Sequence, residues 1–143
     1  MLTPPPPPTE QVAPAAPNAA QLSRLIEGLL FISESEAPLH VVQLPPAPDL
    51  AAAIHAVPAL AGLPLREQPL EEIFFERVAP SEGSGDIDIR QAPAYAALLA
   101  WLRTHVRDAR AVRVGAGAPQ ELFLIGRTPD GGWLGVRTTT VDT

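Results

Sequence analysis

Two short polar segments carry the side chains best suited to chemistry. The first is Ser33-Glu34-Ser35-Glu36, which directly follows a strongly apolar stretch. The second is Thr140-Val-Asp142-Thr143, with which the sequence ends. Carboxylate and hydroxyl oxygens are ligands that Mg²⁺ accepts, and a terminal α-carboxylate would add to the second group. Each segment, taken alone, also fits an ordinary solvated loop or chain end.

The other candidates for catalysis or metal binding are weaker. His40, His55 and His105 are far apart in the sequence and match no metal-ligand spacing. The chain has no cysteine, which excludes disulfides, thiol catalysis and thiolate metal sites. The motifs of serine hydrolases, zinc proteases, P-loops and dinucleotide-binding folds are all missing. Asp86 and Asp88 could bind a cation, but two loop carboxylates are usually just solvated, so we expect no enzyme and no intrinsic cofactor.

A row of arginines allows two interpretations. Arg103, Arg107 and Arg110 are spaced at i, i+4 and i+7 along a predicted helix, and Arg113 follows it. They could form an anion or nucleic-acid patch, or a solvated helix face whose positive charges suit the helix C-terminus, and we favour the second. The net charge of −6 weighs against nucleic-acid binding and fits a cationic protein partner better.

The composition is that of a single domain. With 143 residues, of which 46% are hydrophobic and only 5% aromatic, the chain can bury one largely aliphatic core. No apolar run approaches the roughly 20 residues of a membrane-spanning helix. The start, with Pro4 to Pro8 after Met1-Leu-Thr, lacks the features of a secretory signal. We therefore expect a cytoplasmic protein without a membrane partner.

The chain is predicted to divide into a tail and a folded domain. Residues 1–17 are rich in proline and poor in large apolar side chains, which predicts a disordered tail before a domain over residues 18–143. Asn18 is expected to cap the first helix, with Gln21 at the capping-box position and Gly28 inside the helix. The apolar face of this helix would consist of Leu22, Leu25, Ile26, Leu29 and Leu30.

Helices and strands are expected to alternate in the rest of the domain. Asp49 can cap a short helix, Pro69 starts another, and Pro93 suits the first turn of a longer one. The predicted strands are Leu39–Leu44, Ala111–Gly115, Leu122–Arg127 and Trp133–Val141, the last two joined as a hairpin by Thr128-Pro-Asp-Gly-Gly132. Helices precede strands and lie between them, so the pattern predicts an α/β/α layered fold.

Both ends of the predicted domain resemble the nuclease A inhibitor family. The similar segments are Gly28-Leu-Leu-Phe-Ile-Ser-Glu-Ser-Glu36 with Pro38, Leu122-Phe-Leu-Ile-Gly-Arg-Thr-Pro-Asp-Gly-Gly132, Leu134-Gly-Val136 and the final Thr-Thr-Val-Asp-Thr143. The resemblance covers about residues 20–143. It implies an α/β protein with a C-terminal β-hairpin, built as a three-layer α/β/α sandwich similar to that of pathogenesis-related-1 proteins.

The resemblance also implies a function. Such a protein inhibits a sugar-non-specific, magnesium-dependent ββα-metal nuclease and is not itself an enzyme. The family's glutamate that enters the nuclease active site matches Glu34, and its C-terminal threonine, which coordinates the nuclease's magnesium, matches Thr143. Glu36, Asp86 and Asp142 are the other expected partner-binding residues. A magnesium ion would therefore connect this chain to the nuclease only in the complex, and the free chain would bind none.

One feature of the family is missing from this sequence. The family has an Asp-Trp pair in the loop before the long helix, where this chain reads Ser81-Glu-Gly-Ser-Gly-Asp86. Neither Trp101, in a predicted helix, nor Trp133, on the hairpin, replaces it. Aromatic residues often dominate interfaces, so the change predicts weaker binding or a different target nuclease. The alternative function is a non-inhibitory protein–protein interaction module that shares the fold.

Overall fold

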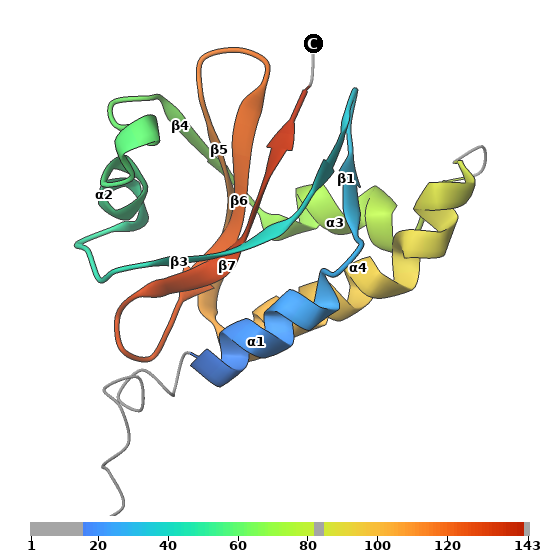
Figure 1. Ribbon diagram of the computed structural model, residues 1–143, viewed down its shortest axis with the longest axis horizontal. Helices are drawn as coiled ribbons and strands as arrows, with labels where there is room; N and C mark the ends of the chain where they lie inside the picture. Colours follow the sequence, from blue (N-terminus) through green and yellow to red (C-terminus); the bar gives the residue numbers. More distant parts are fainter. Residues whose placement is uncertain (1–15, 82–84, 142–143) are drawn as a thin grey trace, which may run out of the picture.

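The computed structural model describes residues 16–81 and 85–141, and a five-stranded antiparallel sheet lies at its centre (Figure 1). The strand order is β3-β7-β6-β5-β4. The strands are β3 (His40–Leu44), β4 (Leu65–Gln68), β5 (Arg107–Val114), β6 (Gln120–Arg127) and β7 (Trp133–Thr140). The sequence predicted four of them, including the β6–β7 hairpin. It missed β4, a short edge strand whose residues are mostly polar.

Helices cover both faces of the sheet. On one face lie α1 (Ala16–Leu25), α3 (Leu70–Val78) and α4 (Asp86–His105), and on the other lie α2 (Leu50–His55) and the 3₁₀ helix η2 (Pro58–Leu60). Each face of the sheet therefore packs against its helices in a hydrophobic core: the first core contains α1, α3 and α4, and the second contains α2 and η2. Strand β6 contributes to both, because Leu122 and Leu124 lie in the first core whereas Phe123 and Ile125 lie in the second. The molecule is thus a mixed α/β protein whose strands all pair antiparallel.

A second, two-stranded sheet lies between β7 and the helices α3 and α4 (Figure 1). It is the hairpin of β1 (Leu30–Ile32) and β2 (Glu36–Pro38), in which Leu30 pairs with Pro38 and Ile32 with Glu36. Phe31 is buried, with 1% of its surface exposed, so the hairpin is packed into the first core.

The first helix is shorter than predicted. It begins at Ala16, so Asn18 is not its N-cap, and it ends at Leu25. Gly28 has a φ of +75°, a left-handed conformation that glycine adopts readily and that is typical of helix ends. The chain then extends into β1. The prediction failed because closely spaced apolar residues fit a short buried strand as well as a helix.

The long helix begins earlier and ends earlier than predicted. It starts at Asp86, where acidic residues suit the positive end of the helix dipole, so Pro93 lies inside it and not in its first turn. It ends at His105, so Arg107 and Arg110 belong to β5, contrary to the prediction. The two other helix starts are confirmed: Asp49 accepts a hydrogen bond from the Ala52 amide at 2.8 Å, and Pro69 directly precedes α3.

Gly135 allows β7 to lie close to β6. A Cβ atom at this position would lie 2.0 Å from the Leu124 carbonyl oxygen and 2.6 Å from the Ile125 Cα atom. We therefore expect Gly135→Ala to lower the free energy of unfolding by about 1–3 kcal/mol, as measured by urea denaturation. Gly117→Ala is the matched control, since a Cβ there meets no atom within 4 Å. Equal stability of the two variants would contradict this packing.

Candidate functional site

The acidic loop at the tip of the β1–β2 hairpin contacts the end of β7. The Glu34 amide donates a hydrogen bond to the Val141 carbonyl oxygen at 2.9 Å. The Val141 amide donates to the Ser33 Oγ atom at 3.0 Å, across 108 positions of sequence. Within the loop, the Ser33 amide donates to the Ser35 carbonyl at 2.8 Å. Two segments from opposite ends of the domain are thus held together by backbone groups and the Ser33 hydroxyl.

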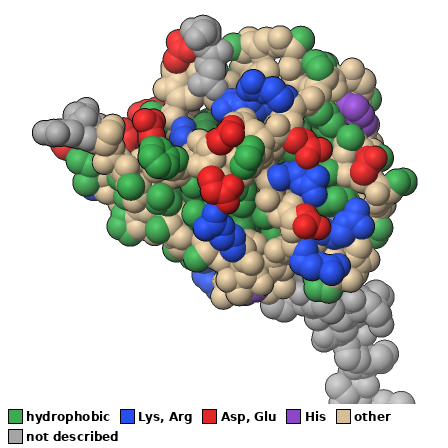
Figure 2. Space-filling view, turned by 180° about the vertical axis from the view of Figure 1, so that it is seen from behind, with side chains coloured by type: hydrophobic (Ala, Val, Ile, Leu, Met, Phe, Trp, Pro, Cys, Tyr) green, Lys and Arg blue, Asp and Glu red, His purple; other side chains and the backbone are tan. Residues whose placement is uncertain are grey.

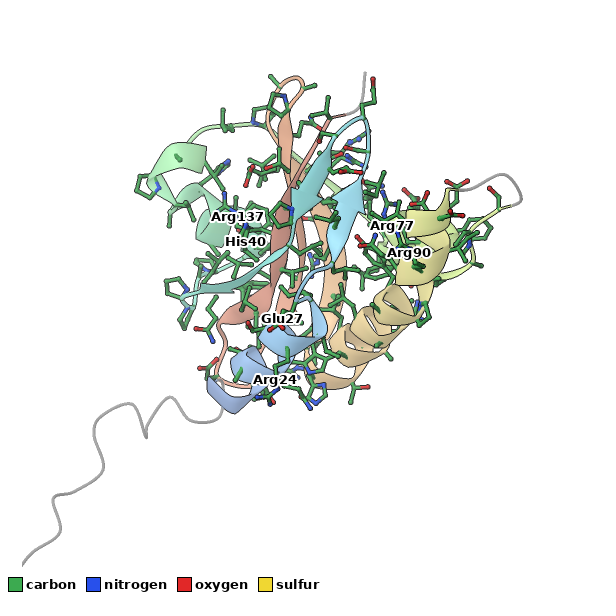
Figure 3. All side chains as sticks on the ribbon, turned by 45° about the vertical axis from the view of Figure 1, so that its right-hand side comes forward. Arg24, Glu27, His40, Arg77, Arg90 and Arg137 are labelled. Carbon is green, nitrogen blue, oxygen red and sulfur yellow. The ribbon has the colours of Figure 1, made fainter. Side chains whose placement is uncertain are left out.

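The predicted site residues are only partly gathered at this tip. Glu34 and Glu36 are both solvent-exposed, in the loop and in the first position of β2. Asp142 and Thr143 lie outside the described residues, directly after Val141. Asp86 is exposed in the first turn of α4, and Figures 1 and 3 show this turn apart from the hairpin tip. The structure therefore groups Glu34 with the end of β7, and Asp86 belongs to a neighbouring surface.

Side chains of α4 occupy the edge of β1 that β2 leaves unpaired. The Gln91 Oε1 atom accepts a hydrogen bond from the Leu30 amide at 2.7 Å, and its Nε2 atom donates to the Leu30 carbonyl at 3.0 Å. The Tyr95 hydroxyl donates to the same carbonyl oxygen at 2.6 Å. The Gln91 side-chain amide thus takes the place of a neighbouring strand, because it offers β1 one acceptor and one donor.

Arg77 connects α3 to the same hairpin, and Figure 3 shows it beside β1. Its guanidinium donates to the Ile32 carbonyl and to the Ile73 carbonyl, each at 2.8 Å. Its Cζ atom lies 3.9 Å from the centre of the Phe31 ring, a cation–π contact. On the opposite side of the hairpin, the Thr138 Oγ1 atom of β7 donates to the Pro38 carbonyl at 2.9 Å. The hairpin is therefore fastened on both sides.

Sequence reasoning missed this support for the acidic loop. Gln91, Tyr95 and Arg77 lie 45 to 65 positions from the β1 residues that they contact. No local spacing connects them, and each residue type is common in helices. The nearest available signal is Tyr95, the single tyrosine of the sequence.

The remaining candidates do not assemble a catalytic or metal centre. In the parts of the chain that the structure describes, no three His, Asp or Glu side chains gather as metal ligands. Arg103 pairs with Glu71 and Arg110 with Glu67, and Figure 2 shows acidic and basic side chains interspersed on the rear face. Among the helices of residues 16–81 and 85–141, none is both long and apolar enough to cross a membrane.

Fold and site together describe a mixed α/β protein that presents a braced acidic loop. Comparison with known families gives a match to the model of the nuclease A inhibitor-like protein family over residues 16–143. The chain belongs to this family. No curated protein matches the sequence. The family resemblance identified from the sequence is thereby confirmed, and the matched region begins at the first residue of α1.

Alkaline titration tests the contact between the buried Tyr95 phenol and the Leu30 carbonyl of β1. Burial raises the pKa of Tyr95 to about 12, although the positive charge of Arg77 acts in the opposite direction. A raised pKa means that the unfolded state loses this proton first, near pH 10. Stability is therefore fully present below pH 10 and falls as the pH rises towards 12.

We expect the free energy of unfolding to decrease by roughly 2–3 kcal/mol between pH 10 and 12. The chain has neither lysine nor cysteine, and arginine titrates above this window, so Tyr95 is the only side chain involved. In Tyr95→Phe the free energy of unfolding should no longer fall between pH 10 and 12, whatever the stability of that variant below pH 10. The ultraviolet absorbance of tyrosinate measures the same pKa directly, and a midpoint near 10 would contradict a buried, hydrogen-bonded phenol.

Proposed function

We propose that this chain inhibits a magnesium-dependent, sugar-non-specific nuclease by placing Glu34 and Thr143 in its active site. Nuclease inhibition in general is the function that membership of the family indicates. The observation that supports the specific mechanism is the pair of hydrogen bonds joining Ser33 and Glu34 to Val141. These bonds bring the acidic loop and the end of β7 to one side of the molecule, as a single active site would require.

The covalent chain limits how far Thr143 can lie from this loop. Thr143 is the second residue after Val141, and two residue steps of an extended chain span at most about 7 Å. Val141 itself is hydrogen-bonded to Glu34. A carboxylate and a threonine hydroxyl are therefore available within one small area, which supports their joint entry into one cleft. Asp142 adds a second carboxylate to the same segment.

The chemistry of a nuclease cleft suits these groups. Such a cleft is organised to stabilise negative charge beside a metal ion. The Glu34 carboxylate would take the place of the scissile phosphate, and the Thr143 hydroxyl would coordinate the nuclease's magnesium ion. Neither group offers a bond that the nuclease can cleave. The inhibitor needs no metal of its own in this scheme.

The support of the hairpin contributes to affinity in this proposal. A flexible acidic loop would lose conformational entropy on binding, whereas a loop already held by Ser33, Val141 and the Gln91 contacts loses less. Glu36, exposed on β2, and the net charge of −6 would help attract a cationic cleft. Asp86 would contact the nuclease at the margin of the interface.

Two finer predictions accompany this proposal. Helices on both faces of the sheet support the three-layer α/β/α sandwich related to pathogenesis-related-1 proteins. Residues 1–15 of the predicted Pro-rich tail lie outside the described residues. We also propose that the inhibitor acts in the cytoplasm.

The proposal predicts that inhibition depends on Glu34 and Thr143 but not on an exposed carboxylate elsewhere. Glu34→Ala and Thr143→Ala should each weaken inhibition by about thirty-fold or more, because removing one partner of a buried charged contact typically costs 2–5 kcal/mol. Glu27→Ala is the matched control: it removes an exposed carboxylate from the turn after α1, away from the hairpin tip in Figure 3. The measurement is DNA digestion by a ββα-metal nuclease in Mg²⁺ at increasing inhibitor concentration.

Circular dichroism of all three variants verifies that each remains folded. The mechanism would be refuted if Glu34→Ala and Thr143→Ala inhibited the nuclease as strongly as the control variant Glu27→Ala. Wild-type protein that binds the nuclease without slowing digestion would favour the non-inhibitory interaction module.

A further inference from the structure

Figure 1 shows the end of α4 and the start of β5 at the end of the molecule opposite the hairpin tip. Residues of both segments line a basic pocket. Its volume is about 470 Å³. Its lining consists of Arg103, Thr104, His105, Val106, Arg107, Arg127 and Pro129. Three arginines and one histidine therefore line a space that no acidic residue lines, in a chain whose net charge is −6.

Two of these arginines face each other across neighbouring strands. Arg107 of β5 is the register partner of Arg127 of β6, so both side chains lie on the same face of the sheet. Like charges in directly opposed positions destabilise a strand pair. Neither arginine forms an ion pair with any residue of the described chain, whereas Arg103, Arg110 and Arg137 do. A bound anion would therefore reduce the repulsion between Arg107 and Arg127.

The backbone beside Arg107 is also irregular. The pairing of β5 with β6 is interrupted by a bulge between Arg107 and Arg110, and Asp108 adopts a φ of 53°. Positive φ is uncommon for residues other than glycine, and bulges redirect side chains, often beside binding sites. The bulge allows Arg107 to pair with Arg127 at the end of the strand, where the pocket opens.

Neighbouring groups orient Arg127 and His105 without placing a carboxylate beside them. The Arg127 Cζ atom lies 4.4 Å from the centre of the Trp133 ring, and this stacking leaves the N–H groups at the guanidinium edge able to bind an anion. His105 is stacked on Trp101 at 4.6 Å, and its Nδ1 atom lies 3.1 Å from the Trp101 carbonyl oxygen. Arg103 shares its charge with Glu71, but both side chains are more than half exposed, so water screens that pair.

We propose that this pocket binds a small phosphorylated anion, of the size of pyrophosphate or a mononucleotide. Arginine forms paired hydrogen bonds with phosphate oxygens, and several converging guanidinium groups favour a multiply charged ligand. The carbonyl groups at the C-terminus of α4 oppose an anion, but their partial charge is smaller than the combined charge of Arg107 and Arg127. A long nucleic acid would extend beyond the pocket onto an acidic protein. This site lies far from Glu34 and does not depend on the proposed inhibition.

Calorimetric titration of the full chain with pyrophosphate at low ionic strength tests the site. We expect saturable binding with one anion per chain and a higher melting temperature in its presence. Arg107→Gln should weaken binding at least about ten-fold, since it removes a fully charged hydrogen-bonding partner. Arg90→Gln is the matched control, because it removes an exposed arginine of α4 outside the pocket lining.

Further comparisons distinguish this pocket from general attraction of anions. Equal loss of binding in Arg107→Gln and Arg90→Gln, or equal binding of chloride at matched ionic strength, would overturn the proposal. Single-stranded DNA that binds more tightly than pyrophosphate would overturn the restriction to small ligands. Arg127→Lys retains the charge and should weaken binding of pyrophosphate while the protein remains folded. Unchanged affinity in that variant would exclude a role for the stacked guanidinium.

Discussion

The unpaired edge of β1 is the constraint on which the position of the acidic hairpin tip depends. A buried strand edge must find hydrogen-bonding partners, and β1 has a strand neighbour only on the β2 side. The side chains of Gln91, Tyr95 and Arg77 supply the missing partners. Because these residues come from two helices of the first core, the packing of α3 and α4 on the sheet also fixes the position of the acidic loop.

The same arrangement brings distant parts of the sequence together. β7 lies between β3 and β6 and contacts β2 through Thr138, so the strand before Val141 is held on three sides. Val141 then meets Ser33 and Glu34. An acidic loop with this support can meet a cationic cleft without a large loss of conformational entropy, which is how a small inhibitor gains affinity. The basic pocket at the other end of the sheet is separate from the acidic hairpin tip.

Much of the fold could be predicted from the sequence, because its signals were local. The β6–β7 hairpin, β3, the Asp49 cap and the start of α3 each depend on neighbouring residues. The errors arose where local patterns were ambiguous. The predicted first helix included Leu29 and Leu30, although α1 ends at Leu25 and Leu30 begins β1. The predicted long helix included Arg107 and Arg110, which belong to β5. Glu34 was a candidate from the family resemblance and stays a prediction. The support of its loop could not be predicted, because side chains 45 to 65 positions away from β1 provide it.

Amide hydrogen exchange at Glu34 and Val141 tests the central claim most directly. Each of these amides has one acceptor, and the two bonds close the contact between the acidic loop and β7. If the loop is preorganised in the free protein, both amides exchange much more slowly than in an unstructured peptide, and at similar rates because they open together. Exchange of both amides at the rate of a free peptide would show that the loop and the end of β7 move independently, and it would contradict the account.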